Sequence, residues 1–87
     1  MSDERNETAD QLKAHIEIAR RNHYRLTGFS PNTIVICHDH LATLLQDSSL
    51  SRYAWFDGGE HFIRGMMVVE DRYSKMPRVM FEHRPVR

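Results

Sequence analysis

The sequence predicts a small α+β domain of order αβαββ, with two helices on one face of a mixed three-stranded sheet. Three observations favour this class. A long amphipathic helical pattern comes first, a β-branched run follows at Thr33 to Cys37, and two strand-like runs come last, at His61 to Glu70 and Arg78 to His83. The 87 residues suffice for one domain, which we place at 9–87 after a flexible N-terminus at 1–8.

The first helix is expected to begin after Thr8. Thr8 and Gln11 match the capping-box pattern, in which two side chains satisfy two backbone N–H groups at the helix start. Side chains that recur at spacings of four and three then mark one face: Leu12, Ile16, Ala19, His23 and Leu26. Gly28 offers the left-handed conformation that commonly ends a helix. We therefore expect a helix of about four turns that buries this face.

The run from Thr33 to Cys37 predicts a buried strand, because it is short and rich in β-branched residues. Asp39 follows and is expected to cap a second helix, which Asp47 and its neighbouring serines end after about two turns. Leucines and an alanine give this helix an apolar stripe: Leu41, Ala42, Leu44 and Leu45. The next strand can pair with the first in parallel or antiparallel fashion, and the pattern leaves both open.

The run from His61 to Glu70 predicts one long strand buried on both faces. Alternation divides its side chains into two sets, Phe62, Met66 and Val68 on one face and Ile63, Met67 and Val69 on the other. Gly65 inside the run indicates a bulge or a close backbone approach. A three-stranded sheet with helices on one face leaves its other face, with Ile63, Met67 and Val69, in need of cover.

Composition limits the function classes. The chain has 12 basic and 12 acidic side chains and a formal net charge of zero, which removes the general attraction of a basic protein to nucleic acids. Cys37 is the single cysteine, so no internal disulfide can form, and this favours a reducing cytoplasm. No stretch is apolar enough to predict a membrane segment.

One cluster has metal-ligand side chains, the segment Cys37, His38, Asp39 and His40. Glu60, His61 and His83 are further candidates, but no ligand pair has the spacing of a known metal motif. Nucleotide-binding and nucleophile motifs are also absent. We therefore expect no metal site, no cofactor and no enzymatic activity, with a small metal-dependent enzyme built on Cys37, His38 and His40 as an alternative.

A second alternative is a regulator that binds nucleic acid. Its phosphate contacts would come from two groups of arginines, Arg20, Arg21 and Arg25 in the first helix and Arg72, Arg78, Arg84 and Arg87 near the C-terminus. Acidic residues offset these charges, and arginines near a helix C-terminus are also favoured by the helix dipole. We therefore expect nucleic acid not to be the partner.

The aromatic segment from Tyr53 to Phe56 indicates a binding surface, since tryptophan and tyrosine are enriched where interfaces bind most strongly. Beside methionines, such side chains form an adaptable apolar patch. The candidate partner-binding residues are Tyr53, Trp55, Phe56, Met66, Met67 and Val69. The expected partner is a protein or a second copy of the chain, with Trp55 at the rim of the surface.

Two segments also match a family pattern. Pro31 to Leu45 reads as a strand, a capped position and a helix with a leucine pair, and Ile63 to Asp71 as a strand with G-x-x-V-V. Residues 31–72, about half of the chain, thereby resemble a strand–helix–strand segment of tailed-phage major capsid proteins. The chain is too short for a shell-forming subunit. The resemblance implies a small phage or prophage accessory protein, a cytoplasmic protein-binding module that acts on a host or virion protein.

Overall fold

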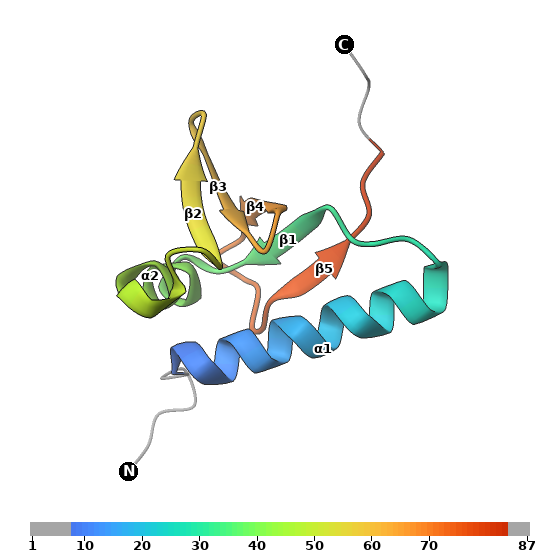
Figure 1. The fold of residues 1–87 in the computed structure, drawn as a ribbon, viewed down its shortest axis with the longest axis horizontal. Helices are drawn as coiled ribbons and strands as arrows, with labels where there is room; N and C mark the ends of the chain where they lie inside the picture. Colours follow the sequence, from blue (N-terminus) through green and yellow to red (C-terminus); the bar gives the residue numbers. More distant parts are fainter. Residues whose placement is uncertain (1–7, 84–87) are drawn as a thin grey trace.

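The computed structural model describes residues 8–83, so only Thr8 of the predicted flexible N-terminus lies within the described range. The helices are α1 (Ala9–Thr27), α2 (His38–Gln46) and the short 3-10 helix η1 (Ser48–Leu50). The strands are β1 (Thr33–Ile36), β2 (Ala54–Asp57), β3 (Glu60–Ile63), β4 (Met66–Glu70) and β5 (Arg78–Met80) (Figure 1). The α+β class is confirmed, whereas the predicted order αβαββ is wrong.

The sheet has five strands in the order β2-β3-β4-β1-β5. β1 and β4 pair in parallel, with Thr33 opposite Met67, and this settles the pairing that the sequence left open. The other three pairs, β2 with β3, β3 with β4 and β1 with β5, are antiparallel. The sheet is mixed as expected, but the prediction of three strands is wrong.

One of the two additional strands arises because the run from His61 to Glu70 is not a single strand. It forms β3 and β4, which are joined by a two-residue turn at Arg64 and Gly65. The φ angles of 56° and 84° at these two residues match a type I′ turn, which suits the twist of a hairpin. Gly65 is therefore a turn residue. The expected bulge is wrong, and so is the expected close backbone approach, because a Cβ added at Gly65 would meet no atom within 4 Å.

The other additional strand is β2, formed by part of the aromatic segment. Gly58 and Gly59, with φ angles of 61° and 85°, make a second two-residue turn that pairs β2 with β3. Asp-Gly-Gly between two β-forming segments is a hairpin signal, so this strand was open to prediction. The β2–β3 hairpin projects away from α1 (Figure 1).

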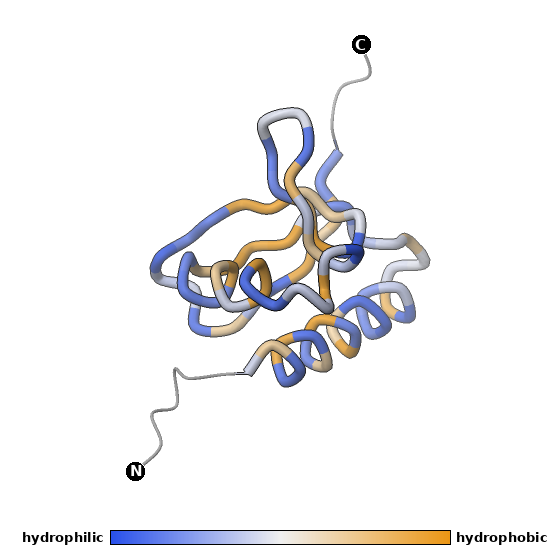
Figure 2. The backbone as a smooth tube through the Cα atoms, turned by 60° about the vertical axis from the view of Figure 1, so that its left-hand side comes forward, coloured by the Kyte–Doolittle hydropathy of each residue, from blue (hydrophilic) through white to orange (hydrophobic). Residues whose placement is uncertain are grey.

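Both helices lie on one face of the sheet, as predicted. The core joins leucine and isoleucine side chains of α1 and α2 to one face of the strands: Leu12, Ile16, Leu41, Leu44, Ile34, Ile36, Ala54, Ile63 and Met66. Figure 2 shows the hydrophobic segments gathered in the strands and on turns of α1, with hydrophilic segments around them. We call this side of the sheet the covered face.

The helix ends confirm one cap and correct another. Thr8 and Gln11 form the predicted capping box, and Gly28 ends α1 with a φ angle of 78°. α2 begins after Cys37, which makes no side-chain cap, so the expected cap at Asp39 is wrong. The predicted apolar face of α1 is buried only in its first half, because Leu26 is 85% exposed.

Candidate functional site

The second face of the sheet carries a row of side chains that is apolar except for Thr33, which is 1% exposed. The strand registers place five side chains next to one another across the sheet: Trp55, Phe62, Met67, Thr33 and Met80. Their alternating neighbours, such as Ala54, Ile63 and Ile34, lie in the core, so this row faces the other way. No helix among residues 8–83 packs on this side, which we call the open face.

Two residues further along the strands, the side chains on this side form two separate groups. Val35 lies between Val69 and Arg78, whereas Asp57 lies opposite Glu60 on the β2–β3 hairpin, and the pairing of β3 with β4 does not extend beyond Phe62 and Met67. Both acidic side chains belong to the β2–β3 hairpin, whereas Arg78 lies on β5, the opposite edge of the sheet.

The exposure of the open face differs between neighbouring strands. Val35 on β1 is 6% exposed, although no described helix covers it. Trp55 and Phe62 are half-buried, and Val69 is 42% exposed. The Trp55 and Phe62 rings stack, with centroids 6.0 Å apart and planes at 20°. This aromatic pair forms a rigid apolar platform on the hairpin.

The predicted partner-binding residues divide into three places. Trp55, Met67 and Val69 lie together on the open face. Tyr53 and Met66 are buried in the core, at 8% and 1% exposure, so they contribute nothing to a surface. Phe56 is exposed, but it follows Trp55 in β2 and therefore points to the other side, where its ring contacts His61 at 4.8 Å.

Sequence reasoning missed Phe62, Val35 and Met80 on the open face, and it placed Ile63 there although Ile63 is buried in the core. The errors at Phe62 and Ile63 have one cause. A single strand sets Phe62 and Met66 on the same face, whereas the turn at Arg64 and Gly65 pairs Phe62 with Met67. The polar residue Arg64 and the glycine Gly65, placed between two apolar segments, could have indicated this hairpin.

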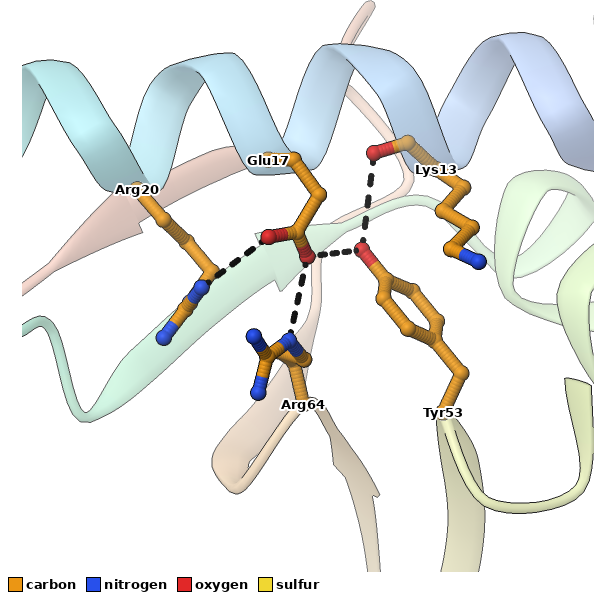
Figure 3. A network of polar contacts seen from close by, with 5 residues as sticks. All are labelled: Lys13, Glu17, Arg20, Tyr53 and Arg64. Atoms are coloured by element: carbon orange, nitrogen blue, oxygen red, sulfur yellow. Dashed lines mark hydrogen bonds and ion pairs between the residues drawn. The ribbon is translucent and has the colours of Figure 1, made fainter.

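A polar network joins the β3–β4 turn to α1 and centres on Glu17 (Figure 3). The Tyr53 hydroxyl donates a hydrogen bond of 2.8 Å to Glu17 Oε2. Arg20 Nη1 lies 3.1 Å from Glu17 Oε1, and Arg64 Nε lies 3.4 Å from Oε2. The backbone N–H of Arg64 also donates to the Tyr53 carbonyl at 2.6 Å. Glu17 therefore holds together three segments that are distant in sequence.

The electrostatics of this network suit a structural tie. Burial raises the pKa of Tyr53, and the hydrogen bond to Glu17 raises it further. The hydroxyl is therefore kept protonated and donates its hydrogen to the carboxylate. The Lys13 ammonium lies 5.3 Å from the centre of the Tyr53 ring, an additional attraction between α1 and the start of β2.

The histidine and cysteine segment is dispersed around the start of α2. His38 Nδ1 lies 3.2 Å from Glu70 Oε1 at the end of β4. His40 is buried, and its Nδ1 has no hydrogen-bond partner among the described residues. Between Thr8 and His83, no three side chains of His, Cys, Asp or Glu are arranged to hold a metal ion.

The arginines do not form one surface. Arg20 is paired with Glu17, whereas Arg21 and Arg25 are exposed on α1. Arg78 lies on the open face, on the opposite side of the sheet from α1. Arg72 lies over the ring of Tyr73, and the two remaining candidates, Arg84 and Arg87, fall outside the described residues.

The comparisons with protein-family models, with curated proteins and with solved structures return no match to this chain. In residues 8–83, no helix combines the length and the apolar character needed to cross a bilayer.

Proposed function

We propose that this chain is a small protein-binding module that binds its partner through the open face. The observation that supports it most is the contiguous run of Trp55, Phe62 and Met67 across three strands, on a side where no helix of residues 8–83 packs. Contiguous apolar patches of this kind mark interaction sites on proteins. Aromatic side chains fixed by stacking also lose little conformational entropy when they bind.

The alternatives have weaker support. Arginines on different sides of the sheet do not favour a phosphate-binding surface, and the histidine segment provides no converging ligands in the described range. The proposal keeps the cytoplasmic location that the single cysteine favours. A narrower proposal, a phage or prophage accessory protein, is supported by the resemblance of residues 31–72 alone. A gene neighbourhood without virion or defence genes would contradict it.

Site-specific photo-cross-linking tests the binding face. A benzophenone amino acid is introduced at position 55, on the open face, and in a second variant at position 56. These adjacent positions on β2 point to opposite sides of the sheet, so they form a matched pair. We expect irradiation in the producing cells to yield discrete protein adducts from position 55 and few or none from position 56.

Two results would overturn the proposal. Equal adduct patterns from both positions would mean that cross-linking reports exposure and not a binding face. No discrete adduct from position 55, in cells where the variant is folded and abundant, would mean that the open face has no protein partner. An adduct of twice the chain mass would identify a second copy of the chain as the partner.

A further inference from the structure

We infer that the protein partner of the open face binds the β2–β3 hairpin through an arginine side chain, whose guanidinium pairs with two carboxylates and whose apolar stem lies on two aromatic rings. This inference rests on the proposed function and specifies the chemistry of the partner. The register of the hairpin pairs Trp55 with Phe62 and Asp57 with Glu60. Residues two apart in a strand share a face, so the two rings and the two carboxylates lie on one side of the hairpin.

The two carboxylates have no cation beside them in the part of the chain that the structure describes. Asp57 and Glu60 are direct cross-strand partners, a position in which like charges are destabilising. Both are exposed, and neither makes an ion pair or a side-chain hydrogen bond within residues 8–83. Arg78, the arginine on this side of the sheet, lies on the opposite edge strand. A cation from a partner would therefore offset a repulsion that the free chain retains.

The aromatic pair provides the other half of the site. Trp55 and Phe62 are stacked and half-buried, so part of each ring remains open to a partner. β2 is an edge strand, and no strand lies beyond Trp55 on that side. Tryptophan is the aromatic side chain that attracts a cation most strongly. The apolar stem of a basic side chain also gains from covering such rings while its charged head stays polar.

The spacing of the two pairs suits an arginine side chain. Residues two apart in an antiparallel strand are separated by about 6.8 Å, which is therefore the distance from the ring pair to the carboxylate pair along the hairpin. The three methylene groups of arginine span about this distance. One arginine can thus lay its stem on the rings and bring its guanidinium to the carboxylates.

A guanidinium fits this site better than other cations. Its planar fork carries five donors, so it can pair with one carboxylate through two parallel bonds and direct a further donor to the second. It also stacks on aromatic faces, whereas the lysine ammonium is compact and strongly hydrated. Calcium takes six to eight oxygen ligands. Within residues 8–83, no third acidic, histidine or cysteine side chain joins this pair.

NMR titration of the ¹⁵N-labelled full chain tests the arginine site directly. The probes are N-acetyl-arginine amide and N-acetyl-citrulline amide, a neutral analogue of similar shape. Exposed ion pairs are weak, so we expect millimolar binding of the arginine probe and at least about fivefold weaker binding of the citrulline probe. The shifts should be concentrated at the indole N–H of Trp55 and at the amides of Asp57 and Glu60. Equal shifts from both probes, or none at these positions up to about 50 mM, would overturn the inference.

Neutralising the hairpin identifies the groups that bind. Asp57→Asn with Glu60→Gln removes both charges with little change in shape, and should weaken binding of the arginine probe at least about fivefold. It also removes the repulsion, so the midpoint of thermal unfolding should rise by about 1–4 °C, and misfolding then cannot explain the loss. Asp10→Asn with Asp39→Asn is the matched control, because both residues are exposed on the helices and the net charge changes equally. Equal probe binding by the two double variants would overturn the inference.

Cross-linking from position 55 separates this inference from the proposed function. In the chain with the neutralised hairpin, the cross-linker should give at least about fivefold less protein adduct. Mass spectrometry of the adduct from the chain with the native hairpin should find an arginine of the partner within a few residues of the attachment point. Undiminished adducts from the neutralised chain would leave the open face as a binding face and make only the arginine wrong. No discrete adduct from either chain would make both proposals wrong.

Discussion

The covered face and the open face of the sheet share one backbone but stabilise the protein differently. On the covered face, Ile34 and Ile63 are fully buried beneath two helices. On the open face, Trp55 and Phe62 are half-buried by contact with each other and with neighbouring strands. The covered face thus supplies most of the free energy of folding, and the open face keeps apolar surface for binding. The four substitutions below test this division.

The largest effect is expected for Ile34→Ala on the covered face. Ile34 is completely buried in the central part of the core, so truncation leaves a cavity and should lower the free energy of unfolding by about 3 kcal/mol. Urea denaturation followed by circular dichroism measures this value. Val69 is the position for comparison on the open face. A similar loss of unfolding free energy on truncation of Val69 would show that both faces stabilise the fold equally.

Tyr53→Phe should have the second largest effect. It removes a hydrogen bond of 2.8 Å to the Glu17 carboxylate, which corresponds to about 1.5 kcal/mol. The pKa of Tyr53 is raised by burial, so the folded protein holds this proton more tightly than the unfolded chain. The stability that the protonated Tyr53 hydroxyl contributes is complete below about pH 10 and falls as the pH rises above that value.

Chemical denaturation between pH 8 and pH 11 distinguishes the wild type from the Tyr53→Phe variant. The wild type should lose stability over the alkaline part of this range, whereas Tyr53→Phe should change less. Parallel curves for the two chains would mean that Tyr53 titrates in the same way in the folded and unfolded states. The network around Glu17 would then not hold the hydroxyl protonated.

Gly65→Ala is expected to cost about 1 kcal/mol, because residues with a side chain rarely adopt left-handed backbone angles. The φ angle at Gly65 is 84°, and an added Cβ meets no atom within 4 Å, so the cost comes from the backbone alone. Thermal unfolding measures it. An unchanged midpoint would show that the turn relaxes without cost, and that the register of the open face does not depend on glycine.

The smallest effect on stability is expected for Val69→Ser. Val69 is 42% exposed on the open face, so the free energy of unfolding should change by less than about 0.5 kcal/mol. Its effect on partner binding should be larger, because Val69 lies on the open face. Comparing urea denaturation with the adduct yield of the cross-linker at position 55 separates the two effects. A stability loss equal to that of Ile34→Ala would abolish the distinction between the faces.

Local sequence signals predicted the helices more completely than the sheet. Thr8, Gln11 and Gly28 determine the ends of α1 through contacts within a few residues, and such contacts can be read from the sequence. The start of α2 was less clear, because Cys37 precedes the helix without a side-chain cap. Asp39 was a plausible capping residue by type, and the helix simply begins before it.

The prediction of the sheet depended on one ambiguous pair of residues, Arg64 and Gly65. Arginine is rare at left-handed backbone angles, so the segment indicated an uninterrupted strand. The ion pair of Arg64 with Glu17 on α1 contributes to fixing this turn, and a contact over such a sequence distance leaves no local pattern. The same limit applies to the candidate site. Trp55, Met67 and Val69 were identified by residue type, whereas Phe62, Val35 and Met80 join them only through strand register.

The parallel pairing of β1 with β4 has a consequence for the order of folding. The β2–β3–β4 segment closes through two-residue turns and can form within about 1–10 µs. Pairing of β1 with β4 requires a contact between Thr33 and Met67, which closes a long loop at an entropic cost and is therefore slower. During synthesis, the apolar β1 is also made before both of its neighbours, β4 and β5, and is exposed to aggregation until they arrive. We expect pulse-labelling hydrogen exchange to show protection in β3 and β4 before β1, and the reverse order would contradict this.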